Sequence, residues 1–190
     1  MKKFAVFVWE IVKVVSISLA IILPVRYYLI QPFYVKGASM EPNFFDHEYL
    51  IIDEISYRFT NPERGQVIVF RYPRNPQEYF IKRVIGLPGE EVMIKDGVVQ
   101  VFNQENPEGL LLNESYLSDD AMTFSSGSAS DERVPIGSNE YYVLGDNRSA
   151  SKDSREFGPV DKSFITGKVW LRGWPFSRAT VFSEADWPQY

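Results

Sequence analysis

The hydrophobic pattern divides the chain into two unlike parts. The first is Phe4 to Val25, which is mostly apolar and whose only charged residues are Glu10 and Lys13. A helix of about 20 apolar residues spans the hydrocarbon core of a bilayer, so this run predicts one N-terminal transmembrane helix. Because Glu10 and Lys13 are three residues apart, they share one helix face and can pair there.

From Gln31 onward the pattern changes to short β-branched and aromatic runs separated by turn signals. These runs predict strands over residues 49–53, 66–70, 79–85, 92–95, 98–101, 140–144 and 167–171. Asp96-Gly97, between two of the runs, predicts a tight hairpin turn. No later stretch keeps a helical period, so the fold class is mainly β, with a coiled, barrel-like antiparallel sheet. The polar stretch from Ser118 to Ser138 predicts an exposed loop.

The same pattern predicts a boundary near residue 30. Residues 1–30 are expected to form a cytoplasmic N-terminus and a membrane anchor, and residues 31–190 an extracytoplasmic domain. Lys2 and Lys3 favour this orientation, because positive residues prefer the cytoplasmic side. A cleaved signal peptide could use Ser18-Leu19-Ala20, but the apolar run continues past it. A buried core helix is the other alternative.

Composition excludes several kinds of chemistry. The 190-residue chain has a formal charge of −5 and no basic stripe, which argues against nucleic acid as a partner. It has no cysteine and a single histidine, His47, so disulfides, thiolate sites and multi-histidine metal sites are excluded. His47 lies in a predicted turn and is interpreted as a surface residue. Catalysis would have to come from serine, lysine, tyrosine and carboxylates.

The first stretch that could carry chemistry follows the apolar run and reads Val35-Lys36-Gly37-Ala38-Ser39-Met40-Glu41-Pro42. Gly37 lets another backbone approach closely, and Pro42 stiffens the exit. Taken alone, a serine in such a setting is more often a turn or capping residue.

The second stretch is the strand around Lys82. Alternation places Phe80, Lys82 and Val84 on one face of the strand, so the lysine has apolar neighbours. Burial lowers the pKa of a lysine, as a general base requires. The alternative is an edge-strand lysine whose ammonium group reaches water.

The third stretch runs from Gly145 to Arg155 and is dense in turn formers, hydroxyls and charges. A solvated loop is one interpretation. Ser149 and Lys152 also match the S-x-x-K pattern of penicillin-binding enzymes, but the K-T-G strand and large helical domain of those enzymes are missing.

Taken together and in order, these stretches resemble bacterial type I signal peptidases, the membrane-anchored Ser/Lys endopeptidases that remove signal peptides. The resemblance covers most of the chain and includes the apolar run and residues 37–42, 49–53, 64–70, 80–90 and 145–155. It implies that Ser39 is the nucleophile and Lys82 the general base, acting through an acyl-enzyme. Gly37 stands where Gram-negative relatives have a serine, so the pattern is similar to the Gram-positive one.

The resemblance also implies supporting and substrate-binding residues. Ser151 matches the serine that orients the lysine, and Asp153 and Arg155 match a structural ion pair. Gly145 matches the glycine packed near the base. Two further supporting positions are Met40 and Arg83, and the expected apolar walls for substrate are Val35, Phe44 and Ile81.

The implied substrate is an exported preprotein with small residues at positions −1 and −3 of its cleavage site, bound as an extended strand. No metal or organic cofactor is implied. The expected partners are signal peptides and membrane lipid, and the enzyme is expected to be a single-pass monomer of the plasma membrane.

Two alternatives to a general signal peptidase remain, and a third is rejected. A related Ser/Lys protease could cut a narrower set, such as pilin-like precursors. A catalytically silent, membrane-anchored scaffold could keep the fold, although retention of both Ser39 and Lys82 argues against it. Self-repressing autoproteases with the same dyad need a DNA-binding headpiece, and the apolar N-terminus does not provide one.

Overall fold

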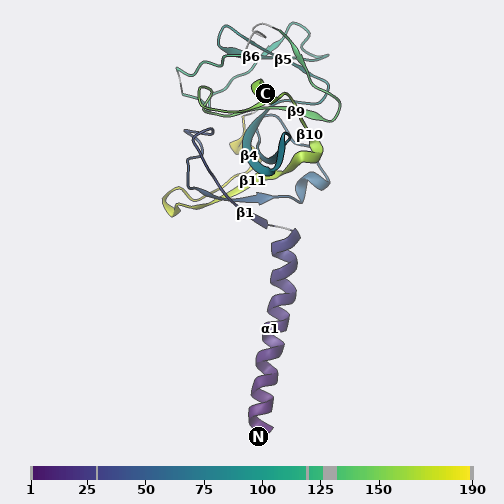
Figure 1. Ribbon diagram of the computed structural model, residues 1–190, viewed down its shortest axis with the longest axis vertical. Helices are drawn as coiled ribbons and strands as arrows, with labels where there is room; N and C mark the ends of the chain where they lie inside the picture. Colours follow the sequence, from purple (N-terminus) through teal and green to yellow (C-terminus); the bar gives the residue numbers. More distant parts are fainter. Residues whose placement is uncertain (1, 29, 119, 126–131, 189–190) are drawn as a thin grey trace.

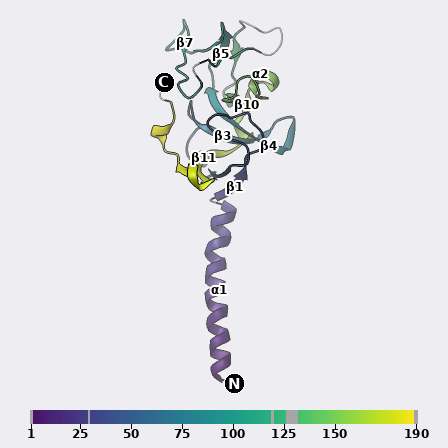
Figure 2. The ribbon, with the colours of Figure 1, turned by 90° about the vertical axis from the view of Figure 1, so that its left-hand side faces the viewer.

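The computed structural model describes residues 2–28, 30–118, 120–125 and 132–188. A long helix, α1 (Lys2–Tyr28), projects from one end of a β domain (Figures 1 and 2). Its stretch Lys3–Leu23 is long and apolar enough to cross a membrane, and none of it is buried against the described chain. A core helix would be mostly covered, so that alternative does not fit. Lys13 Nζ lies 3.4 Å from Glu10 Oε1, which confirms that the two side chains share a face.

The larger sheet is antiparallel and has the strand order β1-β2-β11-β3-β4-β9-β10, with β12 paired to β11. Its strands are β1 (Ile30–Tyr34), β2 (Tyr49–Asp53), β3 (Val67–Tyr72), β4 (Asn75–Gly86), β9 (Glu140–Leu144), β10 (Val160–Asp161), β11 (Ile165–Trp174) and β12 (Thr180–Val181). Register shifts along β4 and β11 mark irregularities that bend the strands and coil the sheet. The sheet is not closed, since β1 and β10 stand at its ends. The predicted mainly β, antiparallel architecture is confirmed.

A smaller sheet lies on the side of the domain away from α1 (Figure 1). It has the order β7-β6-β5-β8 and consists of β5 (Glu91–Lys95), β6 (Val98–Phe102), β7 (Leu110–Leu111) and β8 (Val134–Pro135). Asp96 and Gly97 turn the chain between β5 and β6 with φ values of 51° and 84°. Two successive positive φ values are typical of a two-residue hairpin, so the predicted turn is confirmed.

The larger sheet is covered on both faces around β3, where Val67–Phe70 are all buried. Val67 and Val69 belong to a cluster that includes Met40 and Phe44 from the chain between β1 and β2. Ile68 and Phe70 belong to a second cluster on the opposite face. The segment that carries Ser39 is therefore packed directly onto the core.

The sequence analysis did not predict the strand β1, and it also missed the shortest elements. These are the two-residue strands, the one-turn helix α2 (Ser154–Phe157) and the 3-10 turns η1 (Ser56–Arg58), η2 (Lys162–Phe164), η3 (Phe176–Arg178) and η4 (Glu184–Asp186). The predicted loop from Ser118 to Ser138 is only partly exposed, because Thr123 and Ile136 are buried and β8 lies within it. Residues 119 and 126–131 of that stretch lie outside the described residues.

Candidate active site

Ser39 lies in the loop between β1 and β2, and the loop is fixed on both sides of it. Gly37 has a φ of 87°, in the left-handed region that favours glycine, and its N–H donates to Asp46 Oδ1 at 3.0 Å. Met40 and Phe44, each 1% exposed, anchor the following turn in the core. The N–H of Phe44 donates to the carbonyl of Met40 at 2.9 Å. The backbone around Ser39 is thus held in one place.

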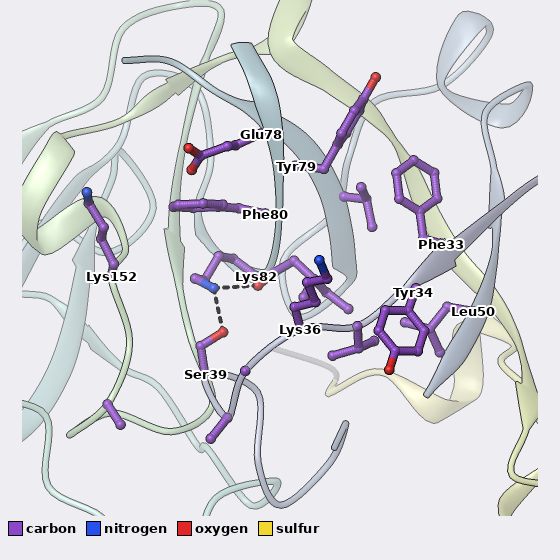
Figure 3. A pocket seen from close by; sticks show the side chains of 16 residues that line it. Phe33, Tyr34, Lys36, Ser39, Leu50, Glu78, Tyr79, Phe80, Lys82 and Lys152 are labelled. Atoms are coloured by element: carbon purple, nitrogen blue, oxygen red, sulfur yellow. Dashed lines mark hydrogen bonds between the residues drawn. The ribbon is translucent and has the colours of Figure 1, made fainter. Parts of the chain in front are cut away.

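Lys82 reaches the same site from β4 (Figure 3). Its Nζ lies 2.7 Å from Ser39 Oγ and 2.7 Å from the carbonyl oxygen of Ile81. The residue is only 3% exposed and its strand is central in the sheet, so the edge-strand alternative does not fit. Burial is the main influence on the amine and lowers the pKa of Lys82 from 10.5 to about 8.

Two buried ion pairs stand near Lys82. Asp153 pairs with Arg155 at 2.7 Å, and Asp146 pairs with Arg83 at 2.6 Å. After burial itself, the carboxylates of Asp153 and Asp146 raise the pKa of Lys82, and the guanidinium of Arg155 lowers it. The charge balance of these pairs therefore affects how easily the lysine loses its proton.

Gly145 occupies a position where no side chain fits. A Cβ there would collide with Ser151 Oγ and with the carbonyl oxygen of Ser39. The N–H of Gly145 donates to Asp153 Oδ2 at 3.0 Å, which ties the glycine to the ion pair. Ser151 Oγ is buried and has no hydrogen-bond partner in the part of the chain that the structure describes. The hydroxyl is therefore packed against Gly145 without being bonded to Lys82.

Two asparagines that the sequence analysis did not select hold the loop between β1 and β2, which we call the nucleophile loop after the expected role of Ser39. The N–H of Asn147 donates to the carbonyl of Ser39 at 3.1 Å, and its Nδ2 donates to the carbonyl of Ala38 at 3.1 Å. Asn43 Nδ2 donates to Asp146 Oδ2 at 2.8 Å. These bonds join residues about a hundred positions apart, and no local pattern in the sequence indicates them.

The carbonyl of Asn43 is held as well. Nη1 of Arg172 and Nη2 of Arg178 donate to it at 2.9 and 3.1 Å. Both arginines also pair with Glu48, which is buried and lies just before β2. Residues from β11 and the turn after it thus fix the end of the nucleophile loop.

A cleft of about 610 Å³ opens beside Ser39 and Lys82 (Figure 3). Its apolar lining consists of Phe33, Val35, Leu50, Val69, Tyr79, Phe80 and Ile81. Val35 and Ile81 therefore lie where substrate contact is expected. Phe44 does not, because it points into the core and packs against the ring of Phe182. Phe33 and Tyr79 were not selected from the sequence, and their rings meet edge-on at 5.2 Å across the cleft lining.

This arrangement can activate a hydroxyl nucleophile. A serine lies within hydrogen-bond reach of an amine that loses its proton near neutral pH, and an apolar cleft lies next to both. Within the described ranges, no group of three histidine, aspartate or glutamate side chains is placed to hold a metal ion.

Comparisons with known proteins identify the family of this chain. The family model described as signal peptidase, peptidase S26 matches residues 8–174. A probable signal peptidase I-2 of Synechocystis is 33% identical over 180 residues, which cover 92% of this chain and 77% of that protein. A signal peptidase IB of Staphylococcus aureus is 34% identical over 171 residues, which cover 86% of this chain and 87% of that protein. The crystal structure of a signal peptidase I from Enterococcus faecalis superposes with a TM-score of 0.46 at 32% identity, covering 57% of this chain and 97% of that one. The chain belongs to the signal peptidase family, peptidase S26.

Proposed function

We propose that this chain is a type I signal peptidase that removes signal peptides from exported preproteins, with Ser39 as the nucleophile and Lys82 as the general base. The observation that supports this most strongly is the 2.7 Å contact between Lys82 Nζ and Ser39 Oγ. Since burial brings the pKa of Lys82 to about 8, an appreciable fraction of the amine is neutral near neutral pH.

In the acylation step, neutral Lys82 accepts the hydroxyl proton of Ser39 while Oγ forms a bond to the scissile carbonyl carbon. The carbonyl oxygen gains negative charge, and the backbone N–H of Ser39 is the proposed donor to it. The Lys82 ammonium then gives its proton to the leaving amine as the C–N bond breaks. In deacylation, Lys82 takes a proton from water while the water oxygen attacks the ester carbonyl carbon, and the Lys82 ammonium then returns that proton to Ser39 Oγ as the ester C–O bond breaks.

The surrounding residues hold these two groups without reacting. Asp153 and Arg155 neutralise each other beside Lys82. Ser151 has a free buried hydroxyl, and we assign to it a hydrogen bond with the lysine during turnover. The full supporting set is Ser151, Gly145, Asp153, Arg155, Met40 and Arg83.

The cleft fits an extended, apolar peptide segment. Val35 and Ile81 line it, and we assign to them contacts with the small side chains before the scissile bond. The comparison proteins are named signal peptidases, which supports a preprotein as the substrate. Phe44 has no direct substrate contact in this proposal, because it lies in the core.

We propose that α1 anchors the protein in the plasma membrane as a single span. The proposed division is residues 1–30 for the cytoplasmic end and anchor and residues 31–190 for an extracytoplasmic, monomeric peptidase domain. Lys2 and Lys3 support this orientation, because positive residues favour the cytoplasmic side.

The test is cleavage of a model preprotein in detergent by the wild type, Ser39→Ala and Lys82→Ala. Both variants are expected to lose several orders of magnitude in kcat, because the members of a catalytic pair act as a unit. Lys95→Ala is the matched control, since Lys95 is an exposed lysine of the small sheet. Its activity is expected to equal that of the wild type.

Other outcomes distinguish the alternatives. Activity that persists in Lys82→Ala would place the base elsewhere. A wild type that cuts only pilin-like precursors would favour the narrower protease, and a wild type inert on every preprotein would favour the scaffold.

A further inference from the structure

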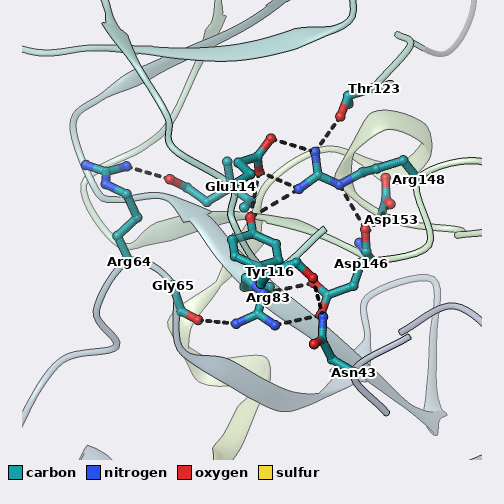
Figure 4. Close-up of polar contacts among 12 residues, drawn as sticks. Asn43, Arg64, Gly65, Arg83, Glu114, Tyr116, Thr123, Asp146, Arg148 and Asp153 are labelled. Carbon is teal, nitrogen blue, oxygen red and sulfur yellow. Dashed lines mark hydrogen bonds and ion pairs between the residues drawn. The ribbon is translucent and has the colours of Figure 1, made fainter. Parts of the chain in front are cut away.

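A polar segment that follows β7 reaches across the domain to the active site. Four of its residues make the contacts, and we call Glu114, Tyr116, Thr123 and Phe124 the clamp residues. Figure 4 shows the first three of them. The segment is tied to the small sheet at both ends, where the N–H groups of Leu112 and Thr123 donate to the carbonyls of Val99 and Gly97 at 3.1 and 2.9 Å. The small sheet is thus linked through this segment to the Ser39–Lys82 pair.

The first contact reaches the nucleophile loop. The carbonyl of Tyr116 accepts from Asn43 Nδ2 at 2.9 Å, and the same amide donates to Asp146. Arg172 and Arg178 hold the carbonyl of Asn43, so the clamp adds a further bond to a residue four positions after Ser39.

The second contact reaches Lys82 through its neighbour on β4. The guanidinium of Arg83 lies 3.9 Å from the centre of the Tyr116 ring. The other atoms of that guanidinium donate to Asp146 at 2.8 and 2.6 Å and to the carbonyl of Gly65 at 2.8 Å. The ring therefore covers the Arg83–Asp146 ion pair, whose carboxylate raises the pKa of Lys82.

The third contact holds Arg148, which is almost fully buried. Its Nη atoms donate to the Glu114 carboxylate, to Thr123 Oγ1 and, at 3.2 Å, to Tyr116 Oη. Its Nε donates at 3.0 Å to the carbonyl of Gly145, the glycine packed against Ser39. Every nitrogen of this arginine is thus used, and Glu114 balances its charge.

We propose that the clamp residues, and Tyr116 above all, are positioning residues that hold Asn43, Arg83 and Arg148 in the arrangement that the Ser39–Lys82 pair needs. The inference rests on the proposed function of that pair. Arg155 adds a fourth link, since its Nη1 donates to the carbonyl of Phe124 at 3.2 Å. A positioning role of this kind affects the chemical step more than substrate binding, because none of the four clamp residues lines the cleft.

The test compares Tyr116→Leu with Tyr116→Phe in preprotein cleavage by the full-length protein in detergent. Tyr116→Leu removes the ring over Arg83 and is expected to lower kcat by about 10- to 100-fold with little change in KM, since small misplacements of reacting groups are costly. Tyr116→Phe keeps the ring and is expected to recover most of the activity. Ser115→Ala, an exposed neighbour on the same segment, is the matched control and should match the wild type.

A pH profile distinguishes two explanations for a loss of activity in Tyr116→Leu, which are misplaced active-site groups and a smaller amount of folded protein. Asp146 raises the pKa of Lys82 and is balanced by Arg83, so a Tyr116→Leu change that shifts Arg83 away from this carboxylate should move the rising limb of kcat/KM to higher pH. Asp153 and Arg155 also face the lysine and are unchanged in this variant. Circular dichroism and thermal unfolding report whether each variant folds. Glu114→Gln, which removes charge and keeps shape, replaces Tyr116→Leu if the latter does not fold.

Three results would contradict the positioning role of the clamp residues. These are a folded Tyr116→Leu with unchanged kcat, an effect on KM alone, or equal losses in Tyr116→Leu and Tyr116→Phe. The proposed function is checked separately in the same assay with the wild type and Ser39→Ala. If the wild type cuts the preprotein and Ser39→Ala does not, any of those three results contradicts the positioning role and leaves the proposed function intact.

Discussion

At the residue scale, the proposed mechanism makes the reactivity of Ser39 depend on the protonation of Lys82. The strand pattern around Phe80 and Val84 indicates a partly desolvated lysine, and the structure shows it nearly fully buried. Its pKa of about 8 results from burial, opposed by Asp153 and Asp146 and assisted by Arg155. In the proposed mechanism, activity therefore depends on pH through the protonation of the Lys82 amine.

We expect kcat/KM to rise with pH and to reach half of its maximum near pH 8. The sign follows from the mechanism, because the reactive form is the neutral amine and its fraction grows as the pH passes the pKa. The measurement is the initial rate of preprotein cleavage from about pH 6 to about pH 10. A flat profile, or one that falls through this range, would contradict a lysine base.

Arg155→Ala should move the same profile to higher pH. The change removes a cation that lowers the pKa of Lys82 and leaves Asp153, which raises it, without its partner. Arg58→Ala is the control, because Arg58 is an exposed arginine of η1. An unchanged midpoint in Arg155→Ala would show that the ion pair does not influence the base.

At the element scale, the sequence predicts what local patterns determine. The main strands, the Asp96-Gly97 hairpin and the exposed pairing of Glu10 with Lys13 follow from alternation, turn chemistry and helical spacing. The bonds of Asn43 and Asn147 could not be predicted, because they join loops that only the folded sheet brings together. Side-chain direction within a loop is equally unpredictable without strand or helix periodicity.

Phe44 lies in a loop and Ile81 in a strand, and the two residues give a paired prediction. Phe44→Ala should lower the free energy of unfolding by about 3–5 kcal/mol, because it opens a cavity in the core. It should leave substrate preference unchanged. Ile81→Ala should cost less stability, since Ile81 is half-buried, and should widen the cleft so that larger side chains are accepted before the scissile bond.

Denaturant unfolding and a panel of preproteins with varied residues before the cleavage site would measure both effects. If Phe44→Ala changes the substrate preference and leaves the free energy of unfolding unaltered, Phe44 contacts the substrate and is not a core residue.

At the scale of the whole molecule, one exposed apolar helix stands apart from a folded β domain (Figure 2). An apolar surface of this size without protein cover is stable in lipid and unfavourable in water. The two lysines before it and the mildly acidic remainder of the chain agree with a domain that stays outside the bilayer.

Alkaline carbonate extraction of membranes tests the anchor. The intact protein should remain in the membrane pellet, as expected for a spanning helix. Release of the intact protein would argue against the span. A shorter product in the supernatant would instead favour cleavage near Ser18-Leu19-Ala20.

The short connection between α1 and the nucleophile loop has a consequence for substrate choice. Tyr28 ends the helix and Ser39 follows eleven residues later, with β1 already paired to β2 in between. Even fully extended, such a chain reaches no more than about 40 Å. In the proposed membrane-anchored enzyme, tethering at this height turns the search for substrate into a two-dimensional one at raised local concentration. We therefore expect a scissile bond that stands well above the membrane surface to stay uncut whatever its sequence.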